Sequence, residues 1–182
     1  MSLVVLLGGA RSGKSRLALE LAGTTGADVT FVATAEALDE EMVDRIAAHR
    51  ADRPSGWRTV EEPLDLARAL ASVDDEATCV VDCLSLWVSN LMLRGDDAAA
   101  VESAAVTCAE AAAARRRALT IAVTNEVGLG VVPATPLGRA YRDVLGTVNR
   151  IWVEACDRAA FVVAGRLLPL EATTAFLPGG KV

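Results

Sequence analysis

The sequence predicts an α/β fold with a mainly parallel central sheet and helices on both faces. Short apolar runs alternate with longer segments in which apolar residues recur at helical spacing. Of the 182 residues, 52% are hydrophobic but only 4% are aromatic, which suits buried parallel strands and close-packed helices built from Ala, Val and Leu. A glycine-rich turn follows the first apolar run directly and leads into a helical segment, as in a strand–loop–helix unit.

That turn, residues 8–15, reads G-G-A-R-S-G-K-S and is a complete G-x-x-x-x-G-K-S phosphate loop. Its glycines let consecutive backbone N–H groups converge on phosphate oxygens, and the next helix directs its amino end at the same anion. The lysine supplies positive charge to the β- and γ-phosphates, and the serine hydroxyl binds Mg²⁺. The predicted nucleotide contacts are Gly8, Gly9, Ala10, Arg11, Ser12, Gly13, Lys14 and Ser15. The alternative is a chance glycine-rich turn, but both flanks favour a nucleotide site in a fold like that of P-loop NTPases.

Five strands are predicted, each at a short apolar or β-branched run: 3–7, 29–33, 78–82, 119–124 and 160–164. The first leads straight into the phosphate loop. The third ends in an aspartate, and the fifth follows the last helical segment. Because every strand is separated from the next by at least one helical segment, the connections favour parallel pairing.

Six helices are predicted from the spacing of apolar residues: 15–22, 38–49, 64–71, 84–93, 97–117 and 137–156. The first follows the phosphate loop, and Pro54 ends the run of the second. The fifth is rich in alanine, the best helix former, with Arg115 to Arg117 at its carboxyl end, so we expect a structural covering helix.

Residues 1–182 are predicted to form one phosphate-loop nucleotide-binding domain, because neither a boundary nor a linker is evident and the length suits one core. No apolar run approaches the roughly 18 residues that a membrane span needs. The first apolar run leads into the phosphate loop and lacks the features of a signal peptide. We therefore expect a cytoplasmic location and no membrane span.

The formal net charge of −6 argues against a broad nucleic-acid surface, which would need a basic face. Basic residues gather locally, however, at the phosphate loop and around the only histidine, so anionic ligands can still be bound. These residues are Arg11, Lys14, Arg16, Arg45, Arg50 and Arg53. The cysteines form no C-x-x-C pair, and we expect buried, reduced thiols at Cys79, Cys83, Cys108 and Cys156.

Asp82 is the predicted second half of the nucleotide site. It ends the apolar run Cys79-Val-Val-Asp82, and an acidic residue at the carboxyl end of a strand near a phosphate loop binds Mg²⁺ in such sheets. The alternative is a helix cap, since the residues from Leu84 onward have helical spacing. The presence of the phosphate loop favours the metal role, with Ser15 and Asp82 as the metal ligands.

His49, the only histidine, is a candidate nucleophile. On a helix, Glu41, Arg45 and His49 recur at i, i+4 and i+8 and lie near one face. An imidazole attacks phosphorus through an unprotonated nitrogen, which its ordinary pKa near 6.5 provides at neutral pH. From spacing alone, however, the favoured interpretation is an exposed helix histidine with no chemical role.

The chain resembles the bifunctional adenosylcobinamide kinase and adenosylcobinamide-phosphate guanylyltransferase family of cobalamin biosynthesis over nearly its whole length. Beyond the phosphate loop, VATAE at 32–36 leads to DEEM at 39–42 and RIAAHRADRP at 45–54, followed by Trp57, Thr59 and Glu61. Further matches are DCLSLWVSNL at 82–91, NEVGLGVVP at 125–133, LGRAYRD at 137–143 and GTVN at 146–149. A general phosphate-loop protein would not share all of these segments.

This resemblance implies a two-step enzyme. A terminal phosphate passes from ATP or GTP to adenosylcobinamide, and GTP then gives GMP to His49 with loss of pyrophosphate. Adenosylcobinamide phosphate accepts the GMP, which yields adenosylcobinamide-GDP. Splitting nucleotidyl transfer into two displacements lets one histidine act first as nucleophile and then as leaving group, while Mg²⁺ and Lys14 neutralise the triphosphate.

The resemblance also implies a homotrimer and further contacts to the guanine nucleotide. The residues carried over by motif are Ala33, Thr34, Ala35, Arg50, Ala51, Asp52, Arg53 and Glu61. The carboxylate of Glu61 suits hydrogen bonds from either a guanine edge or a ribose, and the choice stays open. No residue is assigned as a base for the phosphorylation step.

Several alternatives stay open at this stage. The chain departs from the family pattern at Arg150 and Arg166, which puts corrinoid contacts or subunit packing in question. The glycines of 125–133 suit either a tight turn or a ligand site at the carboxyl edge of the sheet. The competing functions are guanylyltransferase activity alone, a plain phosphate-loop small-molecule kinase in which His49 is idle, and a nucleotide-dependent regulatory protein.

Overall fold

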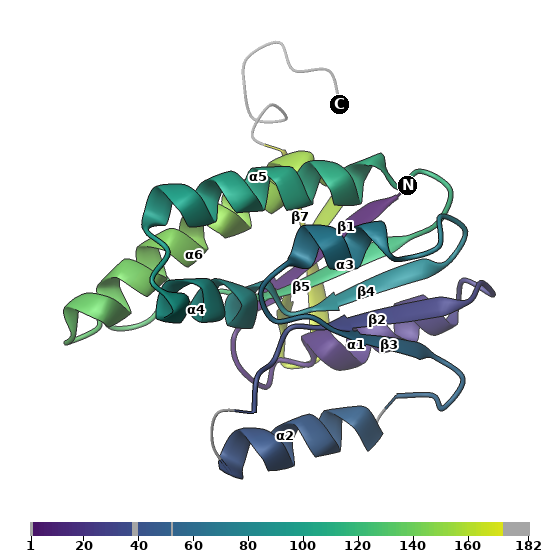
Figure 1. The fold of residues 1–182 in the computed structure, drawn as a ribbon, viewed down its shortest axis with the longest axis horizontal. Coiled ribbons are helices and arrows are strands. Elements are labelled where there is room, and N and C mark those ends of the chain that lie inside the picture. Colours follow the sequence, from purple (N-terminus) through teal and green to yellow (C-terminus); the bar gives the residue numbers. More distant parts are fainter. Residues whose placement is uncertain (1, 38–39, 52, 173–182) are drawn as a thin grey trace.

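The computed structural model describes residues 2–37, 40–51 and 53–172, which form one mostly parallel seven-stranded sheet (Figure 1). The strand order is β3-β2-β4-β5-β1-β6-β7, and β7 alone runs antiparallel to its neighbour. The strands are β1 (Leu3–Gly8), β2 (Val29–Ala33), β3 (Arg58–Glu61), β4 (Thr78–Asp82), β5 (Thr120–Asn125), β6 (Arg158–Val163) and β7 (Arg166–Leu170). The predicted α/β architecture is confirmed.

The described residues also form six helices: α1 (Lys14–Gly23), α2 (Glu40–Ala51), α3 (Leu66–Ala71), α4 (Leu84–Arg94), α5 (Ala98–Ala114) and α6 (Pro136–Ala155). Side chains cap three of them. Asp65 accepts a hydrogen bond from Arg68 N, Asp97 from Ala100 N and Thr135 from Gly138 N. These caps explain where α3, α5 and α6 begin.

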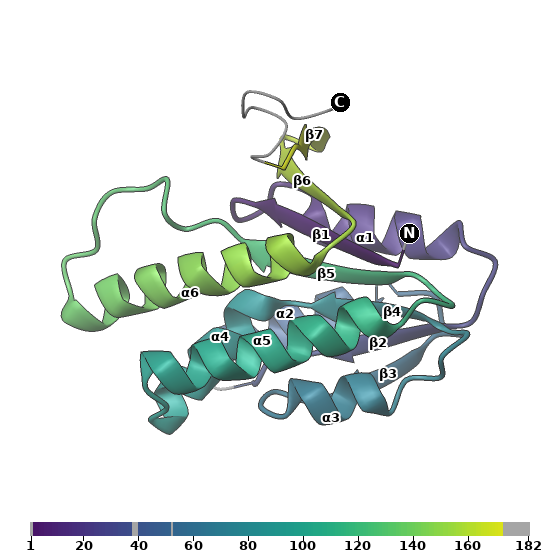
Figure 2. The same cartoon turned by 90° about the horizontal axis from the view of Figure 1, so that it is seen from above.

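Helices cover both faces of the sheet, as predicted. On one face α3, α4, α5 and α6 bury a large apolar cluster that includes the fully buried Trp87 and Trp152. On the other face Ala18 and Ala22 of α1 pack against strand residues such as Ile121. Figure 1 shows α5 and α6 side by side above the sheet and α2 below it, and Figure 2 shows α5 and α6 side by side again from above. Small residues on α1 and α5 allow this close packing.

Two strands were not predicted, and both lie at edges of the sheet. Three of the four residues of β3 are exposed, and all five residues of β7 are exposed. Neither strand therefore carries the continuous apolar run that marks a strand buried on both faces. Strand β7 also contains Pro169, which only an edge strand accommodates well.

The ends of some elements differ from prediction for physical reasons. Helix α5 ends at Ala114, because Arg115 leaves helical geometry. Its buried guanidinium donates hydrogen bonds to the carbonyls of Val73, Asp74 and Ala77 at 2.8 to 3.0 Å. Strand β6 starts at Arg158 and ends at Val163, because Ala164 turns the chain toward β7 at a φ of 50°. Residues 38 and 39 of the second predicted helix lie outside the described residues.

Among the residues that the structure describes, none of the helices has both the length and the apolar character to cross a membrane.

Candidate active site

The phosphate loop leaves β1 at Gly8 and enters α1 at Lys14. Its path needs unusual backbone angles, with φ of 101° at Gly13 and 56° at Arg11. Gly13 is the residue before α1 and has no side chain to cap the helix, so the first N–H groups of the helix stay available for an anion. The Lys14 ammonium donates a 2.7 Å hydrogen bond to the Gly9 carbonyl. The loop therefore has the form of a phosphate cradle.

Gly8 is the glycine that the packing requires. A Cβ atom there would lie 2.2 Å from the carbonyl oxygen of Val162 on β6, whereas one at Gly9 would meet no atom within 4 Å. We expect Gly8→Ala to lower the free energy of unfolding by about 1–3 kcal/mol, since backbone must shift to admit the methyl group. Gly9→Ala is the matched control and should change it by less than about 0.5 kcal/mol. Urea unfolding of both variants measures this, and equal stabilities would contradict the packing argument.

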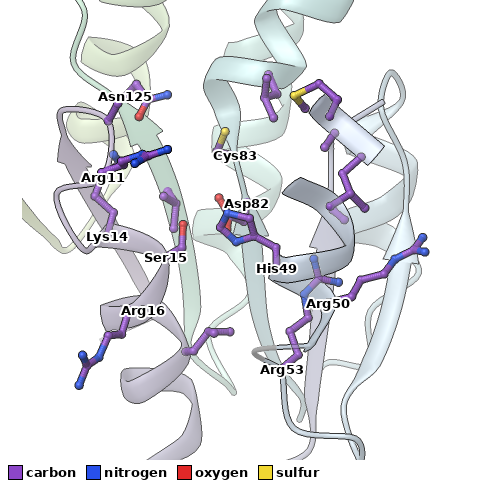
Figure 3. Close-up of a pocket in the computed structure, with 18 of the residues that line it drawn as sticks. Arg11, Lys14, Ser15, Arg16, His49, Arg50, Arg53, Asp82, Cys83 and Asn125 are labelled. Atoms are coloured by element: carbon purple, nitrogen blue, oxygen red, sulfur yellow. The ribbon is translucent and has the colours of Figure 1, made fainter. Parts of the chain in front are cut away.

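A cavity of about 1010 Å³ lies beside the loop at the carboxyl edge of the sheet. It brings together most of the predicted site, as Figure 3 shows for the polar side chains. The predicted residues that line it are Ala10, Arg11, Ser12, Gly13, Lys14, Ser15, Ala33, Ala35, His49, Arg50, Arg53, Glu61 and Asp82. Gly8, Gly9, Thr34 and Ala51 do not line it, and Asp52 lies outside the described residues.

Asp82 and Ser15 lie next to each other near the centre of this cavity (Figure 3). Burial raises the pKa of Asp82, and the hydrogen bond from Ser15 and the charges of His49, Arg53 and Lys14 oppose that rise. The surrounding positive charge therefore compensates the buried carboxylate only in part. Its position at the end of β4 confirms that the loop and Asp82 share one edge of the sheet.

Lys14 is buried at the floor of the cavity, with 7% of its surface exposed. Burial lowers its pKa, while electrostatic interactions with Cys83 and Asp82 oppose the change. A buried ammonium that has a single carbonyl as its hydrogen-bond partner among the described residues gains from an anionic ligand. A triphosphate bound here would supply negative charge and hydrogen-bond acceptors to this ammonium.

His49 lies in the last turn of α2, and its ring points into the cavity beside Asp82 (Figure 3). Its charged form is close enough to lower the pKa of Asp82. The helix thus places the imidazole opposite the phosphate loop. The side chains of Glu41 and Arg45 are outside what the structure describes, so their alignment with His49 stays a prediction.

Arg53 has unused hydrogen-bonding capacity. Its guanidinium carbon lies 3.8 Å from the centre of the Phe31 ring, a cation–π contact. The Nε and Nη1 atoms are buried without a hydrogen-bond partner in the described part of the chain, and burial lowers the pKa of the group. Arg50 differs, because it forms an ion pair with Glu61 at the edge of the cavity. Arg53 is therefore the better placed of the two to bind an anionic ligand.

Thr34 has a structural role in this structure. Its hydroxyl donates to the Cys83 carbonyl at 2.7 Å and accepts from the Cys83 N–H at 2.8 Å, so both capacities are used inside the protein. Its carbonyl accepts a hydrogen bond from the buried Asn90. The side chain therefore connects the ends of β2 and β4 and lies behind the cavity wall.

Sequence reasoning missed several residues of the cavity wall. Asn125 lines it at the end of β5, and the only indication was that ligands bind at the carboxyl edge of such sheets. An apolar wall from α2 was not anticipated at all, because its residues have the ordinary spacing of a helix face. The missed apolar residues on α2 are Met42, Val43, Ile46 and Ala47, and those elsewhere are Leu19, Ala37, Leu86 and Val123.

Comparison with known proteins identifies the family. Residues 4–170 match the family model described as cobinamide kinase / cobinamide phosphate guanyltransferase. The chain belongs to this family. The two activities in the family's name both need a nucleoside triphosphate, in keeping with the phosphate loop that opens the chain.

Curated relatives agree with the assignment to the cobinamide kinase / cobinamide phosphate guanyltransferase family. The chain is 47% identical over 170 residues to the bifunctional adenosylcobalamin biosynthesis protein CobP of Pseudomonas aeruginosa, covering 92% of this chain and 96% of that one. It is 38% identical to CobU of Escherichia coli and 39% identical to CobU of Salmonella typhimurium, both also named bifunctional adenosylcobalamin biosynthesis proteins. Each of these matches covers 90% of this chain and 96% of the relative. The chain is thus an enzyme of the cobinamide kinase and guanyltransferase type.

Solved structures show likeness in fold only. The structure of a protein from Pyrococcus horikoshii, studied as PH0250, aligns with a TM-score of 0.53 at 8% identity, covering 92% of this chain and 85% of that one. The RadB recombinase aligns with a TM-score of 0.49 at 19% identity, covering 88% of this chain and 73% of that one.

Proposed function

We propose that the enzyme phosphorylates adenosylcobinamide with ATP or GTP and then transfers GMP from GTP, through a covalent intermediate on His49, to adenosylcobinamide phosphate. The products are adenosylcobinamide-GDP and pyrophosphate. One observation carries the proposal: the phosphate loop and His49 line opposite sides of the same cavity. A plain kinase needs the loop, but it does not need a histidine facing it.

In the first step the protein positions and neutralises the nucleotide. The loop N–H groups and the amino end of α1 bind the phosphates, and Lys14 offsets their charge. The acceptor hydroxyl oxygen bonds to the terminal phosphorus as the bond to the nucleoside diphosphate breaks. Phosphoryl transfer depends mostly on such positioning, so the lack of an assigned base is no obstacle.

In the second step His49 acts twice. An unprotonated ring nitrogen bonds to the α-phosphorus of GTP, and the bond to pyrophosphate breaks. A phosphate oxygen of adenosylcobinamide phosphate then bonds to that phosphorus while the phosphorus–nitrogen bond breaks, which frees the imidazole. The exposed position of His49 on α2 supports this role, because both nucleotide and acceptor need access to the ring.

Ser15 and Asp82 fit a Mg²⁺ ion. Both offer the oxygen atoms that Mg²⁺ prefers, and the buried carboxylate of Asp82 is only partly compensated by its neighbours. Among the described residues no group of three His, Cys, Asp or Glu side chains can bind a metal by itself, so the ion would depend on phosphate oxygens as further ligands. Once bound, Mg²⁺ would neutralise charge on the triphosphate.

The guanine nucleotide would extend from the loop toward β2, β3 and the end of α2. The free Nε and Nη1 of Arg53 support a phosphate contact there. Glu61 has a carboxylate that accepts hydrogen bonds from a guanine edge or a ribose. Because this carboxylate also forms an ion pair with Arg50, it would bind the nucleotide and Arg50 together. The backbones of Ala33 and Ala35, with Arg50, Ala51 and Asp52, complete the proposed set. Thr34 would act indirectly, because its hydroxyl bonds to the backbone of Cys83 behind the cavity wall.

We further propose a homotrimer that acts in the cytoplasm, where ATP and GTP are present. Exposed apolar side chains on β7, namely Leu167, Leu168 and Leu170, support an assembly that covers them. The molecular mass in solution, measured by light scattering, tests the trimer, and a monomeric mass would exclude it.

Product analysis tests the whole proposal. Purified protein incubated with adenosylcobinamide, ATP, GTP and Mg²⁺ should first accumulate adenosylcobinamide phosphate and then convert it to adenosylcobinamide-GDP, both resolved by mass spectrometry. Supplying adenosylcobinamide phosphate with GTP alone isolates the second step. Formation of the monophosphate only would favour a plain kinase, conversion of supplied monophosphate only would favour a transferase, and neither corrinoid product would exclude the proposal.

A further inference from the structure

We propose that Asn125 is a catalytic residue of the phosphorylation step, whose side-chain amide contacts the terminal phosphate of the nucleotide and the acceptor hydroxyl. This inference rests on the proposed function and assigns a role within it. Asn125 lines the cavity together with Lys14, Ser15 and Asp82.

The strand order brings Asn125 to this position. Strand β5 lies between β1 and β4, so its carboxyl end lies between the phosphate loop and Asp82. Asn125 is the register partner of Gly8, the first residue of the loop, and Val123 is the partner of Asp82. The residue after Asn125 is also bonded to the phosphate loop, because Glu126 N donates a hydrogen bond to the Gly8 carbonyl at 3.1 Å. The side chain thus starts from a fixed point next to the phosphates.

A hydrogen-bond network orients the amide of Asn125. Its Nδ2 donates to the hydroxyl of the buried Ser85 at 3.0 Å, and its backbone carbonyl accepts from Nδ2 of the buried Asn149 at 2.9 Å. Thr124 donates to Oδ1 of Asn149 at 2.6 Å, which fixes Asn149 in turn. This leaves Oδ1 and the second N–H of the half-buried Asn125 amide for a ligand, since neither has a partner in the part of the chain that the structure describes.

The arrangement along the cavity assigns Asn125 to the terminal phosphate. In Figure 3 Asn125 lies at one end of the pocket and Arg53 at the other, with Asp82 and His49 between them. If His49 attacks the α-phosphorus, the β- and γ-phosphates extend from there along the loop. The end of the pocket marked by Asn125, Arg11 and Lys14 then receives the γ-phosphate.

An amide suits the chemistry of this step. Its N–H can donate to a γ-phosphate oxygen as charge develops there, and Oδ1 can accept from the attacking hydroxyl and orient its lone pair. The hydroxyl oxygen bonds to the γ-phosphorus, the bridging oxygen leaves with the electron pair on the nucleoside diphosphate, and the hydroxyl proton passes to a phosphate oxygen. Asn125 itself gains and loses no proton.

The test compares two activities of one variant. In Asn125→Ala the turnover number for phosphorylation of adenosylcobinamide by ATP should fall about 100-fold, as for loss of one transition-state donor. The rate at which GTP labels the protein with GMP should change by less than about threefold, because in that reaction the γ-phosphate only departs with pyrophosphate. Retained GMP labelling also shows that the variant folds and binds nucleotide.

Two further variants sharpen the result. Ser85→Ala removes the partner of Nδ2 and should give a smaller loss of phosphorylation with GMP labelling retained. Glu126→Gln, the matched control next along the chain, changes a side chain that bonds to Gly128 N and does not line the cavity, so it should leave both rates unchanged. Equal loss of both activities in Asn125→Ala, or unchanged phosphorylation, overturns the role of Asn125 alone. Absence of phosphorylation by the unaltered enzyme overturns the proposed first step and this inference with it.

Discussion

Replacing His49 with asparagine is expected to abolish the covalent retention of GMP on the protein and the formation of adenosylcobinamide-GDP. Among the described side chains that α2 contributes to the cavity, the imidazole alone suits nucleophilic attack on phosphorus, and asparagine keeps a polar group of similar size without that capacity. Phosphorylation of adenosylcobinamide should stay within about threefold of the unaltered rate, since that step does not pass through His49. GTP labelled at the α-phosphorus measures the first effect, and corrinoid phosphate formed from labelled ATP measures the second.

The labelled protein should behave as a phosphoramidate, losing the label in acid and keeping it in base. Asp44→Asn is the matched control, because Asp44 is exposed on the same helix and does not line the cavity. It should retain full labelling. Since His49 is exposed, neither substitution should lower the melting temperature appreciably. Undiminished labelling of His49→Asn would mean that another group accepts GMP.

The second large effect is expected from Lys14→Met, which removes the charge and keeps the length of the side chain. Both phosphorylation and GMP transfer should fall by at least about 10³-fold, because both reactions need the same triphosphate neutralised in the same loop. The structure supports a shared site, since Lys14, Asp82 and His49 line one cavity. Initial rates of the two half-reactions, measured at saturating nucleotide, give the two factors separately.

Arg116→Met is the control for the loss of one positive charge. Arg116 is exposed, follows α5 and lies outside the cavity, so both half-reactions should keep their rates. If Lys14→Met abolished phosphorylation but left GMP transfer intact, the two reactions would use different nucleotide sites. The account of a single nucleotide region would then be wrong.

Much of the fold follows from sequence because its buried elements have one-sided or continuous apolar patterns. Strands β1, β2, β4 and β5 are nearly free of exposed residues, so their apolar runs are visible in the sequence. The edge strands β3 and β7 are mostly exposed, and their pairing depends on the neighbouring strand more than on their own residues. The end of α5 could not be predicted either, because Arg115 donates hydrogen bonds to the carbonyls of Val73 and Ala77, which are distant in the sequence.

The site was predictable where a motif sets the backbone and less so where tertiary contacts decide. The phosphate loop positions Lys14 and Ser15 by local geometry, and the carboxyl end of β4 adds Asp82. Thr34 shows the opposite case: it lies in a segment shared with the family, yet its hydroxyl is used by Cys83 behind the cavity. The position of Asn125 follows from the strand order, which the sequence leaves open.

The most direct test of the central claim is the location of the GMP group after incubation with GTP and Mg²⁺. Cleavage at Arg45 and Arg50 under alkaline conditions releases residues 46–50, a peptide that contains His49. Fragmentation mass spectrometry should find GMP on the imidazole of His49 in this peptide, and the adduct should disappear when adenosylcobinamide phosphate is added. GMP on Lys14 or any other residue, or product formation with His49 never modified, would contradict the account.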